Sequence, residues 1–233
     1  MATELADGVW WLDLGSVNAY LVEDGRELVL FDAGTPRSVD ALRAGIDEAG
    51  HAVYDVDRVL VTHYDVDHVG GLAGLRPELD APVIFREPDA SYLTGNKKPS
   101  FWSLKGAVQR VSGVMLTRPD LRVERIIDGE TVGSFTAYHT PGHTRGHMIY
   151  VSESIGVAIL GDLVRENGGT FRPSPWYLSL DTDAVARSIR EVASRSPEFE
   201  VGCPGHGDPI ATGASDEFVR LGSRQGNDAG SVT

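Results

Sequence analysis

Short β-type runs alternate along the chain with two clearly helical stretches. Apolar, β-branched runs bounded by turn residues predict strands. These runs cover residues 9–14, 18–22, 27–32, 57–62, 82–85, 122–127, 131–139, 147–152, 155–161 and 199–203. Apolar residues at three- and four-residue spacing predict one helix with Thr35 as its N-cap and Gly50 at its end, and another capped by Asp181 or Thr182.

The remaining segments give weaker patterns. Residues 88–118 fit two short helices separated by a loop at 95–99, and a last helix is predicted to begin near Asp216. We expect residues 226–233 to be a frayed tail. Strands and helices therefore follow one another without a break in composition, which predicts a single domain over residues 1–225. Its expected architecture is two sheets with helices outside them.

Composition and charge narrow the class of protein. The 233 residues carry a net charge of −13, which disfavours nucleic acid as a partner because a polyanion would be repelled. No apolar run approaches the ~18 residues of a membrane span, and the polar N-terminus does not resemble a signal peptide. The single Cys203 cannot form an internal disulfide. We expect a cytoplasmic, acidic protein with a small-molecule substrate and no membrane partner; a homodimer is left open.

Metal-capable side chains are concentrated directly after apolar strands. The stretch VTHYDVDHVGG at 61–71 places two histidines and two aspartates within six positions. Unpaired charge is costly beside a buried strand, so a merely solvated loop explains this cluster poorly. The other residues that follow strands in this way, or lie in glycine-rich turns, are Asp32, His143, Asp162 and His206. Strand ends can converge at one edge of a sheet sandwich, and imidazole with carboxylate suits zinc, iron or manganese.

These motifs, in this order, resemble the metallo-β-lactamase superfamily over nearly the whole chain. They are Asp32 in its glycine turn, the cluster at 63–68, TPGHTRGH at 140–147, LGDLV at 160–164 and PGHG at 204–207. The resemblance implies an α+β fold, an αββα sandwich of two mixed sheets flanked by helices. It also implies a dinuclear metal site, most simply two zinc ions. Its ligands would be His63, Asp65 and His143 for one ion, Asp67, His68 and His206 for the other, and Asp162 between them.

Asp65 departs from the pattern of that superfamily. The common cluster is H-x-H-x-D-H, and this chain has an aspartate where the second histidine is expected. A carboxylate adds negative charge and favours harder ions, so iron or manganese stays open beside zinc. Asp is also shorter than His, so the first ion is expected to bind differently or weakly, and occupancy of the second site alone stays open.

The constellation predicts a hydrolase of the glyoxalase II and lactonase type. Two cations can lower the pKa of a water towards ~7, and the resulting nucleophile would attack the carbonyl of a small ester, lactone or thioester. Asp67 would be the catalytic residue that orients this nucleophile and returns its proton. The alternatives are an iron-dependent oxidoreductase similar to a sulfur dioxygenase and a non-catalytic ligand-binding protein. β-Lactam cleavage is a minor candidate.

Supporting and substrate-contacting residues are also proposed. The resemblance places Asp32 under the site as a hydrogen-bond acceptor, and His147 is either a supporting residue, a replacement ligand or a histidine merely near the site. Aromatic pairs in separate loops suggest an apolar pocket. Its proposed lining residues are Tyr64, Trp102, Trp176 and Tyr177. Tyr64 could equally belong to the core.

Overall fold

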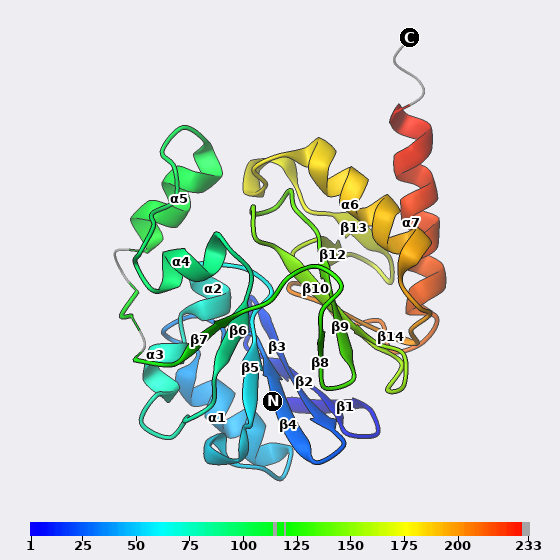
Figure 1. Ribbon diagram of the computed structural model, residues 1–233. Coiled ribbons are helices and arrows are strands. Elements are labelled where there is room, and N and C mark those ends of the chain that lie inside the picture. The colour runs from blue at the N-terminus through cyan, green and yellow to red at the C-terminus, as the bar shows by residue number, and fades with distance from the viewer. Residues whose placement is uncertain (114–115, 119, 230–233) are drawn as a thin grey trace.

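Two β-sheets face each other, with helices on the outer face of each, in the computed structural model of residues 1–113, 116–118 and 120–229 (Figure 1). This is the αββα arrangement of an α+β protein, as the sequence predicts. The helix-covered outer faces and the shared inner face each have their own apolar core.

The first sheet has seven strands in the order of the chain. They are β1 (Ala2–Ala6), β2 (Val9–Asp13), β3 (Asn18–Asp24), β4 (Glu27–Phe31), β5 (Arg58–Leu60), β6 (Val83–Phe85) and β7 (Val123–Arg125). Strands β1 to β4 form an antiparallel meander, whereas β4 to β7 are parallel. Parallel strands need crossover connections, and helices supply them here.

The second sheet has five strands, in the order β14-β11-β10-β9-β8. They are β8 (Thr131–Val132), β9 (Phe135–His139), β10 (Met148–Ser152), β11 (Val157–Gly161) and β14 (Val201–Pro204). Only β11 and β14 are parallel among these neighbours, so their carboxyl ends lie at the same edge. A separate ribbon pairs β12 (Val164–Glu166) with β13 (Phe171–Pro173).

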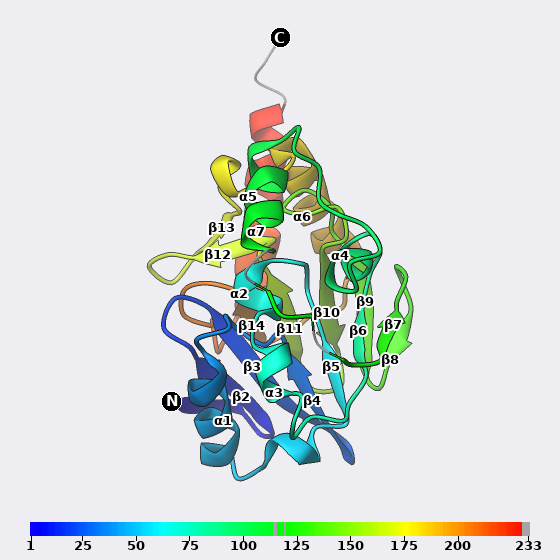
Figure 2. The ribbon, with the colours of Figure 1, turned by 90° about the vertical axis from the view of Figure 1, so that its left-hand side faces the viewer.

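Helices cover both outer faces of the sandwich (Figures 1 and 2). They are α1 (Val39–Glu48), α2 (Val66–Val69), α3 (Leu72–Leu75), α4 (Asp89–Leu93), α5 (Leu104–Ser112), α6 (Thr182–Arg195) and α7 (Ala214–Ala229), with single 3₁₀ turns η1 (Val53–Asp55) and η2 (Trp176–Leu178). Helices α1 to α4 lie on the side of the first sheet, and α6 and α7 on the side of the second. Within the described ranges, no helix has the length and apolar character needed to cross a membrane.

The sheets are joined by an aromatic core and by hydrogen bonds near the ligand loops. The rings of Phe31 and Phe135 lie 4.8 Å apart between the sheets. The Tyr150 hydroxyl donates to the Val61 carbonyl at 2.9 Å, and the Met148 N–H donates to the Thr62 carbonyl at 2.8 Å. The chain leaving β5 is thereby fixed against the second sheet just before the first ligands.

Several helix and strand limits differ from the sequence predictions. Helix α1 begins at Val39 with Ser38 at the N-cap, so the predicted cap at Thr35 is wrong. Thr35 instead shares a hydrogen bond of 2.7 Å with the Ser38 hydroxyl in the turn before the helix. Asp181 does cap α6, because its Oδ1 accepts from the Ala184 N–H at 2.8 Å.

Other differences concern segments with weak apolar patterns. The run at 131–139 is a hairpin of β8 and β9 rather than one strand. The sequence does not predict strand β1 or the β12–β13 ribbon, because these short segments lack a clear alternation of apolar and polar residues. Helix α7 includes residues 226–229, part of the expected frayed tail, while 230–233 lie outside the described residues.

Candidate metal centre

The predicted ligands lie at one edge of the sandwich. Asp32 follows β4, the 63–68 segment follows β5, Asp162 follows β11 and His206 follows β14. Each of these strands is paired in parallel with another of the four, so their carboxyl ends converge. His143 reaches the same place from the loop between β9 and β10.

The seven predicted ligands form overlapping clusters. In each cluster, one ligand atom from every member lies within 4.8 Å of the others. The first cluster is His63, Asp65 and His143, the second is Asp67, His68 and His206, and a third set joins His63 and His68 to Asp162. Segments separated by more than 140 residues therefore place their metal-capable atoms around one small volume.

The second cluster contains donor atoms without hydrogen-bond partners. His206 Nε2 lies 3.3 Å from Asp162 Oδ2 and 3.6 Å from Asp67 Oδ2. His68 Nε2 lies 3.5 Å from Asp162 Oδ1. Among the described residues, His68 Nε2 and Asp162 Oδ1 are buried atoms that form no hydrogen bond. Such orphaned atoms are costly unless something else satisfies them.

The histidines of the second cluster are oriented from behind. Asp32 adopts a left-handed φ of 58°, and its Oδ2 lies 2.8 Å from His68 Nδ1 while also accepting from the Thr62 hydroxyl. His206 Nδ1 donates to the Ser16 carbonyl at 2.6 Å. Protons held at Nδ1 leave the Nε2 lone pairs directed at the cluster, as metal-binding imidazoles require.

Carboxylates create a negative potential at the second cluster. Burial acts to lower the pKa of His68, but the Asp32 and Asp162 carboxylates outweigh it and raise this pKa well above its usual value. Asp162 likewise raises the pKa of His206 against the effect of burial. The neighbouring histidines in turn hold the pKa of Asp162 well below its usual range, although burial alone would raise it. The same potential attracts a divalent cation.

Gly205 allows the PGHG loop to approach this cluster. A Cβ at Gly205 would lie 2.2 Å from Asp162 Oδ1 and 2.9 Å from His68 Cε1, closer than side-chain atoms can pack. The loop is held by residues that sequence reasoning missed. The Asn18 amide donates to the Pro204 and Gly207 carbonyls at 3.0 and 2.7 Å, and the Tyr20 hydroxyl donates to Pro204 at 2.7 Å.

The first cluster contains a cation supplied by the chain. The Lys105 ammonium, on α5, contacts Asp65 Oδ2 and lies 2.9 Å from His143 Nε2. Gln109 Nε2, one turn later, donates to Asp65 Oδ1 at 2.9 Å and to the Tyr64 carbonyl at 2.6 Å. Asp65 Oδ2 also lies 3.2 Å from His63 Nε2 and 3.0 Å from His143 Nε2. Both oxygens of Asp65 are therefore satisfied by protein groups.

The pKa values of this cluster reflect the buried ammonium. Burial acts to raise the pKa of Asp65, but the Lys105 ammonium, with the imidazoles of His143 and His63 beside the carboxylate, holds it well below the usual range. Burial, together with the Lys105 charge, lowers the pKa of His143 to about 4. A neutral His143 with its Nδ1 proton donated to the Ser174 hydroxyl at 2.8 Å presents a lone pair to the ammonium.

Asp89 ties together the two loops that carry the first cluster. Its fully buried carboxylate accepts from the Tyr64 N–H at 2.9 Å, the Thr144 hydroxyl at 2.7 Å and the Gly146 N–H at 3.0 Å. The 63–65 segment and the His143 loop thus share one acceptor. Sequence reasoning missed Asp89, and its position directly after Pro88 in a weakly patterned segment gave no signal for it.

The comparisons with known proteins agree with the fold and with the donor clusters described above. Residues 12–206 match the metallo-beta-lactamase superfamily. The chain belongs to this superfamily. The probable metallo-hydrolase YflN of Bacillus subtilis is 25% identical over 89% of this chain and 86% of its own length. The atrochrysone carboxyl ACP thioesterase of Aspergillus fumigatus is 26% identical over 85% of this chain but only 53% of the longer fungal protein.

A solved structure shares the fold. The metallo-β-lactamase of Cronobacter sakazakii with an HARLDQ motif superposes with a TM-score of 0.72 at 18% identity, covering 99% of this chain and 96% of the other. Superfamily membership and the donor clusters together indicate a divalent-metal site. The orphaned atoms His68 Nε2 and Asp162 Oδ1, next to two further imidazole or carboxylate donors, fit such an ion.

His147 lies next to His63. It is fully buried, its Nδ1 lies 2.7 Å from the Thr140 hydroxyl and its ring centroid lies 5.1 Å from that of His63. Burial, with the adjacent His63 and His143, holds the pKa of His147 well below its usual value. None of the three donor clusters includes it, although its buried Nε2 also lacks a hydrogen-bond partner among the described residues, so His147 is placed as a packing neighbour of His63.

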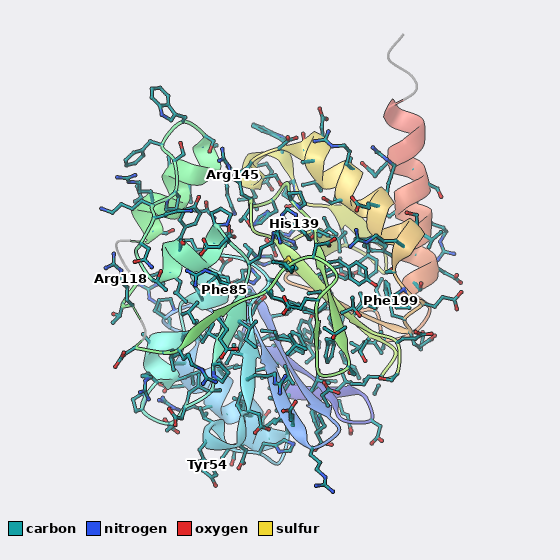
Figure 3. All side chains as sticks on the ribbon, viewed as in Figure 1. Tyr54, Phe85, Arg118, His139, Arg145 and Phe199 are labelled. Atoms are coloured by element: carbon teal, nitrogen blue, oxygen red, sulfur yellow. The ribbon has the colours of Figure 1, made fainter. Side chains whose placement is uncertain are left out.

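The proposed aromatic lining is only partly at the site. Trp102 is 99% exposed and borders a cavity of about 380 Å³ between α5 and the 141–145 loop, where Figure 3 labels Arg145. Tyr64 is buried in the first core and lines an adjoining cavity of about 510 Å³. Trp176 and Tyr177 are 73% and 51% exposed, stack edge-on at 5.8 Å, and line neither of these two cavities.

Proposed function

We propose that this chain is a metal-dependent hydrolase of acyl thioesters, with small esters and lactones as related substrates. The observation that carries the proposal is the second cluster with the adjacent Asp162, where buried atoms without hydrogen-bond partners lie beside the partly exposed Asp67. The family supports hydrolysis, and the fungal relative named as an ACP thioesterase supports the thioester class.

The ion we propose is zinc, held by Asp67, His68 and His206 with Asp162 beside them. Two imidazoles and a carboxylate form a common catalytic zinc set with a position left for substrate or water. When bound, zinc supplies Lewis acidity and lowers the pKa of a water towards neutrality. Iron would instead support the oxidoreductase alternative, so the identity of the metal tests the proposal directly.

Asp67 is suited to handle the proton of the attacking water. Its side chain is 33% exposed, whereas those of His68 and Asp162 are at most 4% exposed. A partly exposed carboxylate can accept a hydrogen bond from the nucleophile and later return its proton to the leaving group. Asp162 lies deeper and faces three histidines, which fixes its position rather than leaving it free to exchange protons.

The cavities beside the site support a phosphorylated thiol as the leaving group. The cavity of about 510 Å³ is lined by Tyr64, by Gln109, which also donates to Asp65 of the first cluster, and by four basic residues. These are Lys97, Lys98, Arg110 and Arg118. Among the described residues that line it, none is acidic, although the chain as a whole has a charge of −13. Coenzyme A and phosphopantetheine carriers have phosphate at the far end of the pantetheine arm whose thiol forms the thioester, and basic side chains bind phosphate by charge-assisted hydrogen bonds.

A substrate panel tests this function. Zinc-loaded protein is assayed with butyryl-coenzyme A, butyryl-N-acetylcysteamine, p-nitrophenyl butyrate and a γ-lactone, before and after dialysis against a chelator. We expect chelator-sensitive hydrolysis with the highest kcat/KM for butyryl-coenzyme A. If the protein hydrolysed none of the four substrates and co-purified with iron, the result would contradict the hydrolase and favour the oxidoreductase.

A further inference from the structure

Helix α5 has its polar side chains turned inward and its apolar ones turned out. Leu104, Val108 and Val111 are more than half exposed, while Lys105 and Gln109 are at most 7% exposed. Residues four apart lie on one face of a helix, so Lys105 and Gln109 point together. The Ser103 hydroxyl caps the helix by accepting from the Gly106 N–H at 3.1 Å, which fixes where this face begins.

The inward face of α5 meets the first cluster. Lys105 contacts Asp65 Oδ2 and His143 Nε2, and Gln109 contacts the other oxygen of Asp65. A buried ammonium is tolerated when a carboxylate compensates it, and Asp65 does so here. The departure at position 65 and the buried lysine thus form one charge-neutral unit.

The ammonium and an ion compete for the same space. Lys105 Nζ lies on the lone-pair side of His143 Nε2 and against Asp65 Oδ2, which are the atoms that an ion in the first cluster would need. A dication placed beside the ammonium would be repelled at close range in a region of little water. Binding there would require Lys105 to leave, and its departure would expose the interior between α5 and the ligand loops.

We propose that Lys105 is the cation of the first cluster, so that the protein binds a single divalent ion, in the second cluster. The ammonium stands where the resemblance to two-metal proteins predicts the other ion. It lies 2.9 Å from His143 Nε2, and that atom lies 3.5 Å from Asp162 Oδ2. The inference rests on the metal binding of the proposed function but not on its substrate class.

Metal counting tests the proposal directly. Chelator-treated protein is titrated with Zn²⁺ in a calorimeter, and the zinc retained after gel filtration is measured by elemental analysis. The intact protein is expected to retain one zinc per chain. Lys105→Ala, which frees Asp65 and His143, is expected to retain two. Lys97→Ala is the matched control, because it removes an exposed lysine from the preceding loop, and it is expected to retain one.

Lysine labelling provides a second readout that needs no variant. The chain has three lysines, and Lys97 and Lys98 are exposed whereas Lys105 is buried. Zinc-loaded protein is treated with an amine-acylating reagent, and the labelled positions are read by peptide mass spectrometry. We expect Lys97 and Lys98 to be acylated and Lys105 to stay protected at saturating zinc. If a second ion displaced Lys105, this lysine would be acylated too.

Each outcome has a defined meaning. One zinc with a protected Lys105, and two zinc ions in Lys105→Ala, support the proposal. Two zinc ions in the intact protein, with Lys105 acylated, overturn it while leaving the hydrolase intact. One zinc in a folded Lys105→Ala also overturns it, because the lysine would not be what excludes the ion. No zinc in the intact protein overturns both this inference and the proposed function.

Discussion

The two halves of the donor cluster differ in what neutralises their carboxylates. In the first, Lys105 and Gln109 satisfy both oxygens of Asp65. In the second, Asp162 Oδ1 and His68 Nε2 lack hydrogen-bond partners in the described part of the chain, although both are buried. The two halves lie side by side and use the same residue types, yet only one has unfilled bonding capacity.

This difference shows that the types of ligand residue alone do not determine how many metal ions a site binds. His63, Asp65 and His143 are as close together as Asp67, His68 and His206. The clusters differ because a side chain from α5, that of Lys105, contacts only the first of them, and this lysine lies outside every ligand motif. Buried polar atoms require partners, so a cluster completed by the protein has less need of an ion than a cluster left incomplete.

Removing a ligand from each half should give the largest contrast. His68→Ala removes a donor whose Nε2 faces Asp162, so we expect loss of bound zinc and a fall in kcat/KM of roughly a thousandfold. His143→Ala in the first cluster should retain its zinc. Elemental analysis and initial rates with the preferred substrate check both expectations.

A remote histidine provides the control for these two variants. His51 pairs with Glu23 at 3.2 Å and packs on Trp10, away from the ligand loops, so His51→Ala should leave zinc content and kcat/KM unchanged. Retention of zinc by His68→Ala, or its loss from His143→Ala alone, would reverse the assignment of the two halves.

Asp89 should support stability more than metal binding. Asp89→Ala leaves the Tyr64 N–H, the Thr144 hydroxyl and the Gly146 N–H without their acceptor, which we expect to cost about 3 kcal/mol of unfolding free energy. Urea unfolding in the presence of chelator measures this cost. The exposed Asp80→Ala should change stability by no more than about 0.5 kcal/mol. A similar loss in both variants would show that the buried bonds contribute little.

The contrast between the halves also shows which parts of the site could not be predicted from the sequence. The ligand loops were predictable because each combines an apolar strand, a metal-capable residue and a glycine within a few positions. Lys105 and Asp89 lie 37 and 21 residues beyond His68, in a stretch whose pattern predicted only two short helices. Their partners are distant along the chain, and local periodicity carries no information about such contacts.

The misplaced and missed elements have the same physical origin. Tertiary contacts rather than pattern define β1 at the edge of the first sheet and the β12–β13 ribbon. The aromatic pocket stays a prediction: Trp102, Trp176 and Tyr177 are each more than half exposed, and composition alone could not tell a pocket lining from a solvent-exposed loop. The pattern of α5 points the wrong way: apolar residues at 104, 108 and 111 predict that this face is buried, whereas it is exposed and Lys105 and Gln109 are buried.

Asp32→Asn should weaken zinc binding only at the second cluster. Asn keeps the shape of the side chain but removes the charge beside His68 Nδ1, and loss of such a partner typically lowers metal affinity by about 10–100-fold. Competition with a chromogenic chelator measures the Kd. Asp89 braces the first cluster, so Asp89→Ala should leave the zinc Kd unchanged. Equal weakening in both variants would argue against an ion confined to the second half.

The smallest effect concerns the basic cavity next to the first cluster. Lys97→Glu with Lys98→Glu should raise KM for butyryl-coenzyme A by about fivefold at low salt, a scale typical of exposed charge pairs, and leave butyryl-N-acetylcysteamine unaffected. The paired control, Arg26→Glu with Arg37→Glu, makes the same charge change at exposed positions outside this cavity and should leave both KM values unchanged. The difference should shrink at high ionic strength, because solvent-exposed charges are screened. A KM that rises equally for both thioesters would mean that the lysines shape the entrance and do not bind phosphate, and the charge-neutral first cluster would then be the part of this region that contacts substrate.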